Sequence, residues 1–178
     1  RGSSEEDRYS SGPRNAIKST VVNYDWKNFQ ILAPALQNLK KYYKPKKLIL
    51  IGHSGGAYQG GTIHGKVPGL VDINILISCP CDWETRKKLS NGKKWETKSQ
   101  LKELKKNSPS FNYKDIDLKS LNILIVGKDD KNTAPGVSKY YYDLLKKKKL
   151  QVKLHIIDGG HGLRSMPTIG SIIKEYIN

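Results

Sequence analysis

Residues 48–57 have the sequence LILIGHSGGA, and this stretch decides the fold. Its four apolar residues are typical of a parallel strand covered on both faces, and a glycine–x–serine–x–glycine motif follows them and leads into a helical stretch. This combination is a nucleophile elbow, a tight turn that holds its serine in a strained conformation with the hydroxyl exposed. A side chain at Gly52 or Gly56 would strike the neighbouring strand or helix. We therefore predict Ser54 as a nucleophile and the backbone N–H of Gly55 as an oxyanion donor.

Apolar runs and helical patterns alternate along the chain. Strands are predicted at the apolar runs 48–51, 71–79, 121–126 and 152–157. Helices are predicted at 25–43, directly after the serine, at 135–149 and at 166–176. In the first helix Pro34 predicts a kink or a late start, and one buried face is expected to hold Phe29, Leu32, Ala33, Leu36 and Leu39. Strands that alternate with helices indicate an α/β fold, a mostly parallel sheet with helices on both faces.

The domain organisation follows from where apolar residues are scarce. Residues 1–15 contain almost none, so we predict a loop or disordered arm there and one domain over 16–178. The segment 82–113 interrupts the alternation, because lysines interleave with tryptophans and leucines and no strand pattern occurs; we predict a small helical, cap-like excursion above the sheet. Its aromatic residues either line an acyl or leaving-group pocket or pack within a surface helix pair. We assign Trp83 and His53 to the substrate pocket.

A serine hydroxyl becomes a nucleophile when a base takes its proton, and histidine is the usual base. His161 lies in the glycine-flanked stretch DGGHG after the last predicted strand, where its ring can swing over the strand ends, so we predict it as the base. The carboxylate that orients it is sought in the loop after the third predicted strand, where Asp129 and Asp130 are adjacent. Asp158 is a weaker candidate, because it lies only three residues before the histidine. From the residues alone, the choice between Asp129 and Asp130 stays open.

The chain order serine, aspartate, histidine resembles that of the α/β-hydrolase superfamily. The resemblance extends from about Trp26 onward and rests on the segments GHSGGA, LNILIVGKDD and GGHG. It is strongest to the branch of dienelactone-hydrolase-like and prolyl-oligopeptidase-like enzymes. It implies that Asp130, three residues after Gly127, is the acid of a Ser-His-Asp triad, and that the reaction is cleavage of an ester, thioester or amide bond. It also implies that no metal or organic cofactor is required.

The same resemblance implies strands upstream of the elbow and a second oxyanion donor on an upstream loop. No such strand pattern precedes the elbow here. We therefore expect the sequence to be the C-terminal part of a longer hydrolase or a shortened relative, and a poor enzyme when expressed alone.

Composition narrows the classes of partner. The formal charge of +16 comes from 32 basic and 16 acidic residues, but lysine dominates and arginine, the residue preferred for phosphate and base recognition, is scarce. We expect no nucleic-acid partner, and a small molecule or peptide as substrate. No apolar run approaches the roughly 18 residues of a membrane span, so we expect a soluble protein. No secretory pattern is present at the start of the sequence, so we expect a cytoplasmic location. We expect Cys79 and Cys81 to be reduced, since they are too close for an unstrained bridge within one strand.

Two competing hypotheses remain from the sequence. One is a non-catalytic α/β-hydrolase-like binding protein with a vestigial triad. The other is a basic interaction protein whose charge carries its function, which would show salt-sensitive association with nucleic acid.

Overall fold

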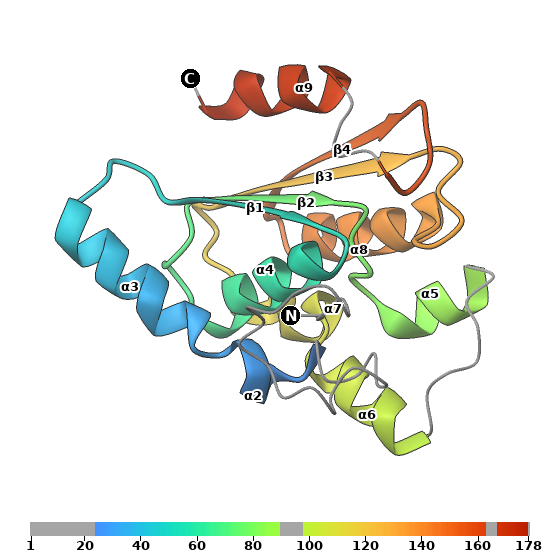
Figure 1. The fold of residues 1–178 in the computed structure, drawn as a ribbon, viewed down its shortest axis with the longest axis horizontal. Helices are drawn as coiled ribbons and strands as arrows, with labels where there is room; N and C mark the ends of the chain where they lie inside the picture. Colours follow the sequence, from blue (N-terminus) through green and yellow to red (C-terminus); the bar gives the residue numbers. More distant parts are fainter. Residues whose placement is uncertain (1–23, 90–97, 163–166, 178) are drawn as a thin grey trace, which may run out of the picture.

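A four-stranded parallel sheet forms the centre of the protein in the computed structural model, which describes residues 24–89, 98–162 and 167–177 (Figure 1). Its strands lie in the order β1-β2-β3-β4 and every neighbouring pair is parallel. Their bounds are β1 Ile49–His53, β2 Ile73–Ile77, β3 Leu121–Gly127 and β4 Gln151–Ile157. The predicted α/β class and all four predicted strands are therefore confirmed.

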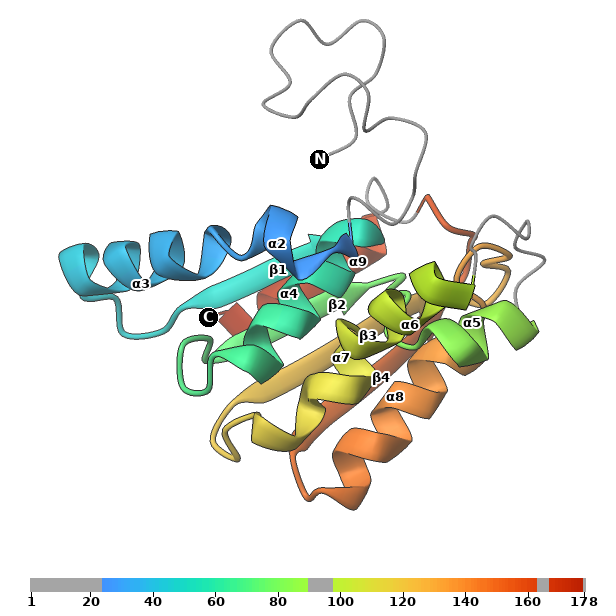
Figure 2. The ribbon, with the colours of Figure 1, turned by 90° about the horizontal axis from the view of Figure 1, so that it is seen from below.

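Helices cover both faces of this sheet. The helices α4 (Gly55–Lys66) and α8 (Pro135–Lys147) lie on one face and α9 (Pro167–Ile177) lies on the other (Figures 1 and 2). Alternation along the strands explains the two layers, because successive side chains point to opposite faces. Ile75 and Ile125 pack with α9, whereas Leu76 and Leu124 pack with residues of α4 and α8.

The predicted first helix is divided into α2 (Trp26–Phe29) and α3 (Leu32–Tyr43). Pro34 falls in the first turn of α3, a position where proline removes no intrahelical hydrogen bond, so the late start is confirmed. The predicted buried face is correct for Phe29 and Ala33. It is wrong for Leu32 and Leu39, which are 42% and 49% exposed.

The segment that interrupts the strand pattern is helical where the structure describes it. It contains α5 (Trp83–Leu89), α6 (Lys98–Lys106), α7 (Pro109–Asn112) and the short 3-10 helix η2 (Tyr113–Asp115). These helices lie on the same side of the sheet as α4 (Figure 2). A role for them as a cap over a substrate stays a prediction, and the predicted arm at 1–15 falls outside the described residues.

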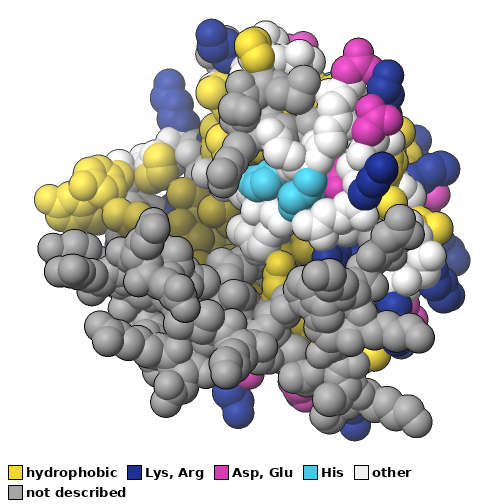
Figure 3. Space-filling view, turned by 45° about the vertical axis from the view of Figure 1, so that its right-hand side comes forward, with side chains coloured by type: hydrophobic (Ala, Val, Ile, Leu, Met, Phe, Trp, Pro, Cys, Tyr) yellow, Lys and Arg dark blue, Asp and Glu magenta, His cyan; other side chains and the backbone are white. Residues whose placement is uncertain are grey.

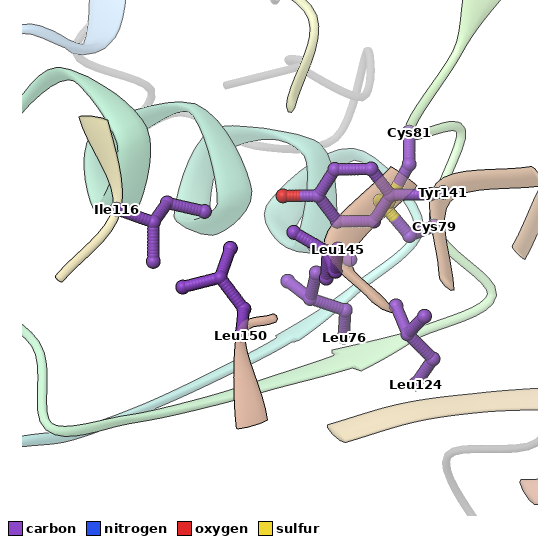
Figure 4. Packing of buried hydrophobic residues seen from close by; sticks show 9 residues of the cluster. Leu76, Cys79, Cys81, Ile116, Leu124, Tyr141, Leu145 and Leu150 are labelled. Atoms are coloured by element: carbon purple, nitrogen blue, oxygen red, sulfur yellow. A yellow bond between two sulfur atoms is a disulfide. The ribbon is translucent and has the colours of Figure 1, made fainter. Parts of the chain in front are cut away.

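The prediction of two reduced cysteines is wrong, because Cys79 and Cys81 form a disulfide. The predicted strand extended to Cys79, but β2 ends at Ile77 and both cysteines lie in the loop that follows. Their Cα atoms are 5.0 Å apart, within the range that a disulfide spans. Both side chains are fully buried, and they pack at the edge of a cluster that contains Leu124 and Tyr141 (Figure 4).

None of the helices in the described ranges combines the length and hydrophobicity that crossing a lipid bilayer requires.

Candidate active site

Ser54 lies in the turn between β1 and α4 with φ 52° and ψ −115°, a conformation that non-glycine residues rarely adopt. Its backbone N–H donates to the carbonyl of Ile77 at 2.8 Å, which ties the turn to β2. A Cβ at Gly52 would lie 2.5 Å from the backbone of Gly56, so only glycine fits at Gly52. A Cβ at Gly56 would meet nothing within 4 Å, so the prediction that this second glycine is required for space is wrong.

The amino end of α4 lies at this turn, since the helix begins at Gly55. The first N–H groups of a helix have no intrahelical acceptor, and the side chain of the N-cap residue Ser54 makes no capping hydrogen bond to them. These groups and the positive end of the helix dipole favour negative charge next to the Ser54 hydroxyl. The Tyr24 hydroxyl lies beside Gly55, 3.3 Å from where a Cβ on that residue would be.

Three side chains from three strand ends meet at this turn. The Nε2 atom of His161 lies 2.9 Å from the Oγ atom of Ser54. The Nδ1 atom of the same ring lies 3.0 Å and 3.2 Å from the two carboxylate oxygens of Asp130. The carboxyl ends of parallel strands share one edge of a sheet, which explains how His161 reaches both Asp130, 31 positions away, and Ser54, 107 positions away.

The carboxylate of Asp130 is buried and held by several donors. Its Oδ1 atom accepts the backbone N–H groups of Asn132 and Thr133 at 2.9 Å and 2.8 Å, and its Oδ2 atom accepts the Thr133 hydroxyl at 2.7 Å. Burial alone would raise the pKa of Asp130. The hydrogen bonds from His161 and Thr133 outweigh burial and hold that pKa well below its ordinary value. The group is therefore ionised across the physiological pH range.

Thr133 is a site residue that the sequence analysis missed. Besides its two bonds to Asp130, its hydroxyl oxygen lies 3.1 Å from the carbonyl of Ser78 and 3.2 Å from Nδ1 of His161. The sequence does contain a signal for this role. Thr133 lies three residues after an aspartate and two residues before the proline that opens α8, and such Asp/Thr pairs form local side-chain to backbone turns.

Asp129, the alternative acid, points elsewhere. Its side chain is exposed, and its backbone N–H donates to the carbonyl of Gly159 at 3.0 Å. Asp158 pairs with Lys128 at 2.8 Å on the surface. Of the three aspartates considered, the structure brings only Asp130 to the ring of His161.

Comparison with known proteins assigns the chain to a family. The prolyl oligopeptidase family, Peptidase_S9, matches residues 4–175. The chain belongs to this family. Among curated proteins, no relative matches.

Solved structures of similar fold include peptidases and esterases. An acylaminoacyl peptidase of Pyrococcus horikoshii is 19% identical over 84% of this chain and 27% of its own, with a TM-score of 0.68. Prolyl oligopeptidase B of Galerina marginata is 18% identical over 72% of this chain and 20% of its own, with a TM-score of 0.61. An esterase of Pyrococcus furiosus is 20% identical over 90% of this chain and 65% of its own, with a TM-score of 0.61. The chain thus spans between a fifth and just over a quarter of these peptidases and about two thirds of the esterase, and it has the α/β-hydrolase fold.

The other histidines of this prolyl oligopeptidase family member occupy different environments. The Nε2 atom of His53 lies 2.7 Å from the backbone carbonyl of His161. His64 is buried in α4 beside the hydroxyl of Ser120, and burial lowers its pKa to about 4. His155 in β4 lies 3.0 Å from the Tyr176 hydroxyl. Only His53 contacts the site.

Trp83 is 3% exposed and packs edge-on against Tyr24 and Tyr58, with the guanidinium of Arg86 4.6 Å from its ring centre. This aromatic group belongs to the core beneath α4, and a role for Trp83 in a substrate pocket stays a prediction. No cluster of three or more metal-ligating side chains occurs within the described ranges.

Proposed function

We propose that the protein is a serine hydrolase that cleaves carboxylic ester, thioester or amide bonds through Ser54, His161 and Asp130. The observation that carries this proposal is the continuous contact from the Ser54 hydroxyl to Nε2 of His161 at 2.9 Å and from Nδ1 to Asp130 at 3.0 Å. Membership of the prolyl oligopeptidase family and a fold shared with peptidases and an esterase support it.

In the first half of the reaction the Oγ atom of Ser54 attacks the substrate carbonyl carbon while Nε2 of His161 takes the hydroxyl proton. The negative charge that develops on the carbonyl oxygen is stabilised by the backbone N–H of Gly55 and the amino end of α4. The tetrahedral intermediate then breaks its bond to the leaving alcohol, thiol or amine, which receives the proton from His161. The product is an acyl ester on Ser54.

In the second half a water molecule takes the place of the leaving group. His161 accepts a proton from the water, which attacks the acyl carbon, and the proton then returns to Oγ of Ser54 as the acid departs. Asp130 stays ionised throughout, since hydrogen bonds hold its pKa low, and its charge stabilises the imidazolium at each step. No metal or organic cofactor takes part in this scheme.

The substrate is a small molecule or peptide, and the bond class is left broad for a physical reason. The three side chains act on any carbonyl with a suitable leaving group, whereas selectivity depends on the walls around the acyl and leaving groups. Relatives with this fold include enzymes named as peptidases and as esterases.

A fluorophosphonate probe on the full-length protein tests the proposal. Such a probe forms a stable adduct only with an activated serine, so we expect labelling at Ser54 by peptide mass mapping. Ser54→Ala should abolish labelling and lower hydrolysis of a p-nitrophenyl ester by about 10⁴-fold or more, with an unchanged melting temperature. Residual activity within tenfold of wild type in Ser54→Ala would refute the assignment.

A non-catalytic binding protein with a vestigial triad is the second candidate. The observation in its favour is that Gly55 supplies one oxyanion donor while a pair is usual for this fold. In that case the folded full-length protein would bind a carbonyl ligand but would not be labelled at Ser54.

A further inference from the structure

His53 contacts the site, but the proposed reaction gives it no role. It is the last residue of β1, it is bonded covalently to Ser54, and its side chain is half-buried. Its Nε2 atom lies 2.7 Å from the backbone carbonyl of His161, and the two imidazole rings are 5.1 Å apart between centres. Histidine side chains lie next to one another on the face of the molecule shown in Figure 3.

The direction of this hydrogen bond follows from its acceptor. A backbone carbonyl oxygen has no proton, so Nε2 of His53 carries the hydrogen and donates it. The contact therefore fixes the tautomer of a neutral His53 and leaves Nδ1 of that ring without a proton. His53 cannot act as a base through Nε2 while this bond is made.

The loop that carries His161 needs such a tether. Glycines flank the histidine at 159, 160 and 162, and Gly159 has a φ of 118°, so the backbone is free to adopt many conformations. The carbonyl of Gly159 accepts the N–H of Asp129 at 3.0 Å, which anchors the start of the loop. After Gly159, the hydrogen bond from His53 is the one that holds the backbone of His161, among the residues that the structure describes.

We infer that His53 is a positioning residue that holds the catalytic base over the nucleophile, an inference that rests on the proposed function. Because His53 is joined to Ser54 through one peptide bond and to His161 through one hydrogen bond, it sets the spacing between Oγ and Nε2 across the turn. The reaction depends on that spacing, since proton transfer requires hydrogen-bond distance. The side chain touches neither the attacking atom nor the carboxylate.

Two substitutions separate the hydrogen bond from the volume of the ring. His53→Leu fills similar space without a donor, and His53→Gln keeps a side-chain N–H of similar reach. In the full-length protein we expect His53→Leu to lower kcat for a p-nitrophenyl ester about tenfold with little change in KM, the factor expected from one lost hydrogen bond. His53→Gln should restore most of that loss, and the rate of fluorophosphonate labelling at Ser54 should follow kcat.

His155 provides the matched control, because it is a half-buried strand histidine whose ring contacts Tyr176 away from the site. His155→Leu and His155→Gln should leave kcat and the labelling rate unchanged. Equal activity of His53→Leu and wild type would overturn the inference. The inference would also be overturned if kcat of His53→Gln were no higher than kcat of His53→Leu.

A spectroscopic measurement keeps the inference testable if a variant fails to fold. Nitrogen-15 NMR of the ring nitrogens in the Ser54→Ala protein should show His53 as the Nε2–H tautomer, and detection of the Nδ1–H tautomer would contradict the tether. This readout needs no activity. Absent labelling of wild type with an Nε2–H His53 would therefore refute the proposed function and leave the tether standing.

Discussion

Replacement of Asp130 by asparagine tests the electrostatic basis of the proposed mechanism. The substitution keeps the shape of the side chain but removes a charge that lies 3.0 Å from Nδ1 of His161. The backbone N–H groups of Asn132 and Thr133 hold one oxygen of the present carboxylate, so the amide oxygen would take that position and the amide nitrogen would face His161. An amide nitrogen donates to Nδ1, which places the ring proton on Nε2, where it blocks acceptance of the Ser54 proton.

The magnitude follows from charge and geometry. Two unit charges about 4 Å apart interact by about 4 kcal/mol at an effective dielectric constant of 20, and this is the stabilisation that the imidazolium loses. At about 1.4 kcal/mol for each factor of ten, kcat should fall about 10³-fold from the lost charge alone. The wrong tautomer carries the expected loss toward about 10⁴-fold.

The matched control is Asp129→Asn, which removes the neighbouring, exposed carboxylate. An exposed charge contributes at most about 1 kcal/mol, so kcat should change by less than about fivefold. Both variants are assayed as full-length protein with a p-nitrophenyl ester and by the rate of fluorophosphonate labelling. If Asp129→Asn were inactive and Asp130→Asn active, the acid of the triad would have to be reassigned. If kcat of Asp130→Asn were within tenfold of wild type, the argument from charge would be refuted.

Three further predictions concern stability and covalent structure. Burial lowers the pKa of His64 to about 4 in the folded protein, whereas in the unfolded chain the pKa is near 6.5. The unfolded chain therefore gains a proton first as the pH falls, and the free energy of unfolding should drop by about 3 kcal/mol between pH 6.5 and pH 4. The uncharged variant His64→Gln should flatten the dependence of melting temperature on pH in that window, and a slope equal to wild type would contradict this. Gly52→Ala should lower the free energy of unfolding by on the order of 3 kcal/mol, because the new Cβ would lie 2.5 Å from backbone atoms. Gly56→Ala should change the stability by at most about 0.5 kcal/mol, since its Cβ would meet nothing within 4 Å. Thermal melting measures both, and a larger loss for Gly56→Ala than for Gly52→Ala would disprove the packing account. Alkylation in denaturant should modify Cys79 and Cys81 only after reduction, and reduction should cost about 1.6 kcal/mol of stability through loop-closure entropy; two thiols reactive without reductant would show that the disulfide is absent.

The strands and the elbow were predictable because they rest on local rules. Leu121–Gly127 is buried along nearly its whole length, so its apolar run identifies a strand covered on both faces. The conformation of Ser54 follows from the motif around it, and the position of Pro34 limits where its helix begins.

What was missed depends on loops and on neighbours. The contact of His53 with the His161 carbonyl exists only once two loops have folded against each other, and no spacing in the sequence encodes it. The bonds of Thr133 to Asp130 are local, but a threonine three residues after an aspartate occurs in many turns and does not by itself identify a site residue. The disulfide was missed because the end of β2 was placed two residues too late. Leu32 and Leu39 follow helical periodicity, but the direction of α3 relative to the sheet decides how much of that face is covered.

The residues that directly follow strands β1, β2 and β3 affect how readily the site opens by local unfolding. Ser54 donates its backbone N–H to the carbonyl of Ile77, Ser78 donates to Ile125, and Lys128 donates to Ile157, each at 2.8 Å. The residue that follows β1, β2 or β3 is thus bonded to the carboxyl-terminal part of the next strand, and the carbonyl oxygen of Ser78 lies 3.1 Å from the hydroxyl oxygen of Thr133. Nucleophile and acid are connected through the sheet itself, so their amides should open only when the sheet opens. In native-state hydrogen exchange, the N–H groups of Ser54 and Ser78 should exchange at the slow rate of global unfolding although both follow the ends of strands, where fraying normally sets the rate.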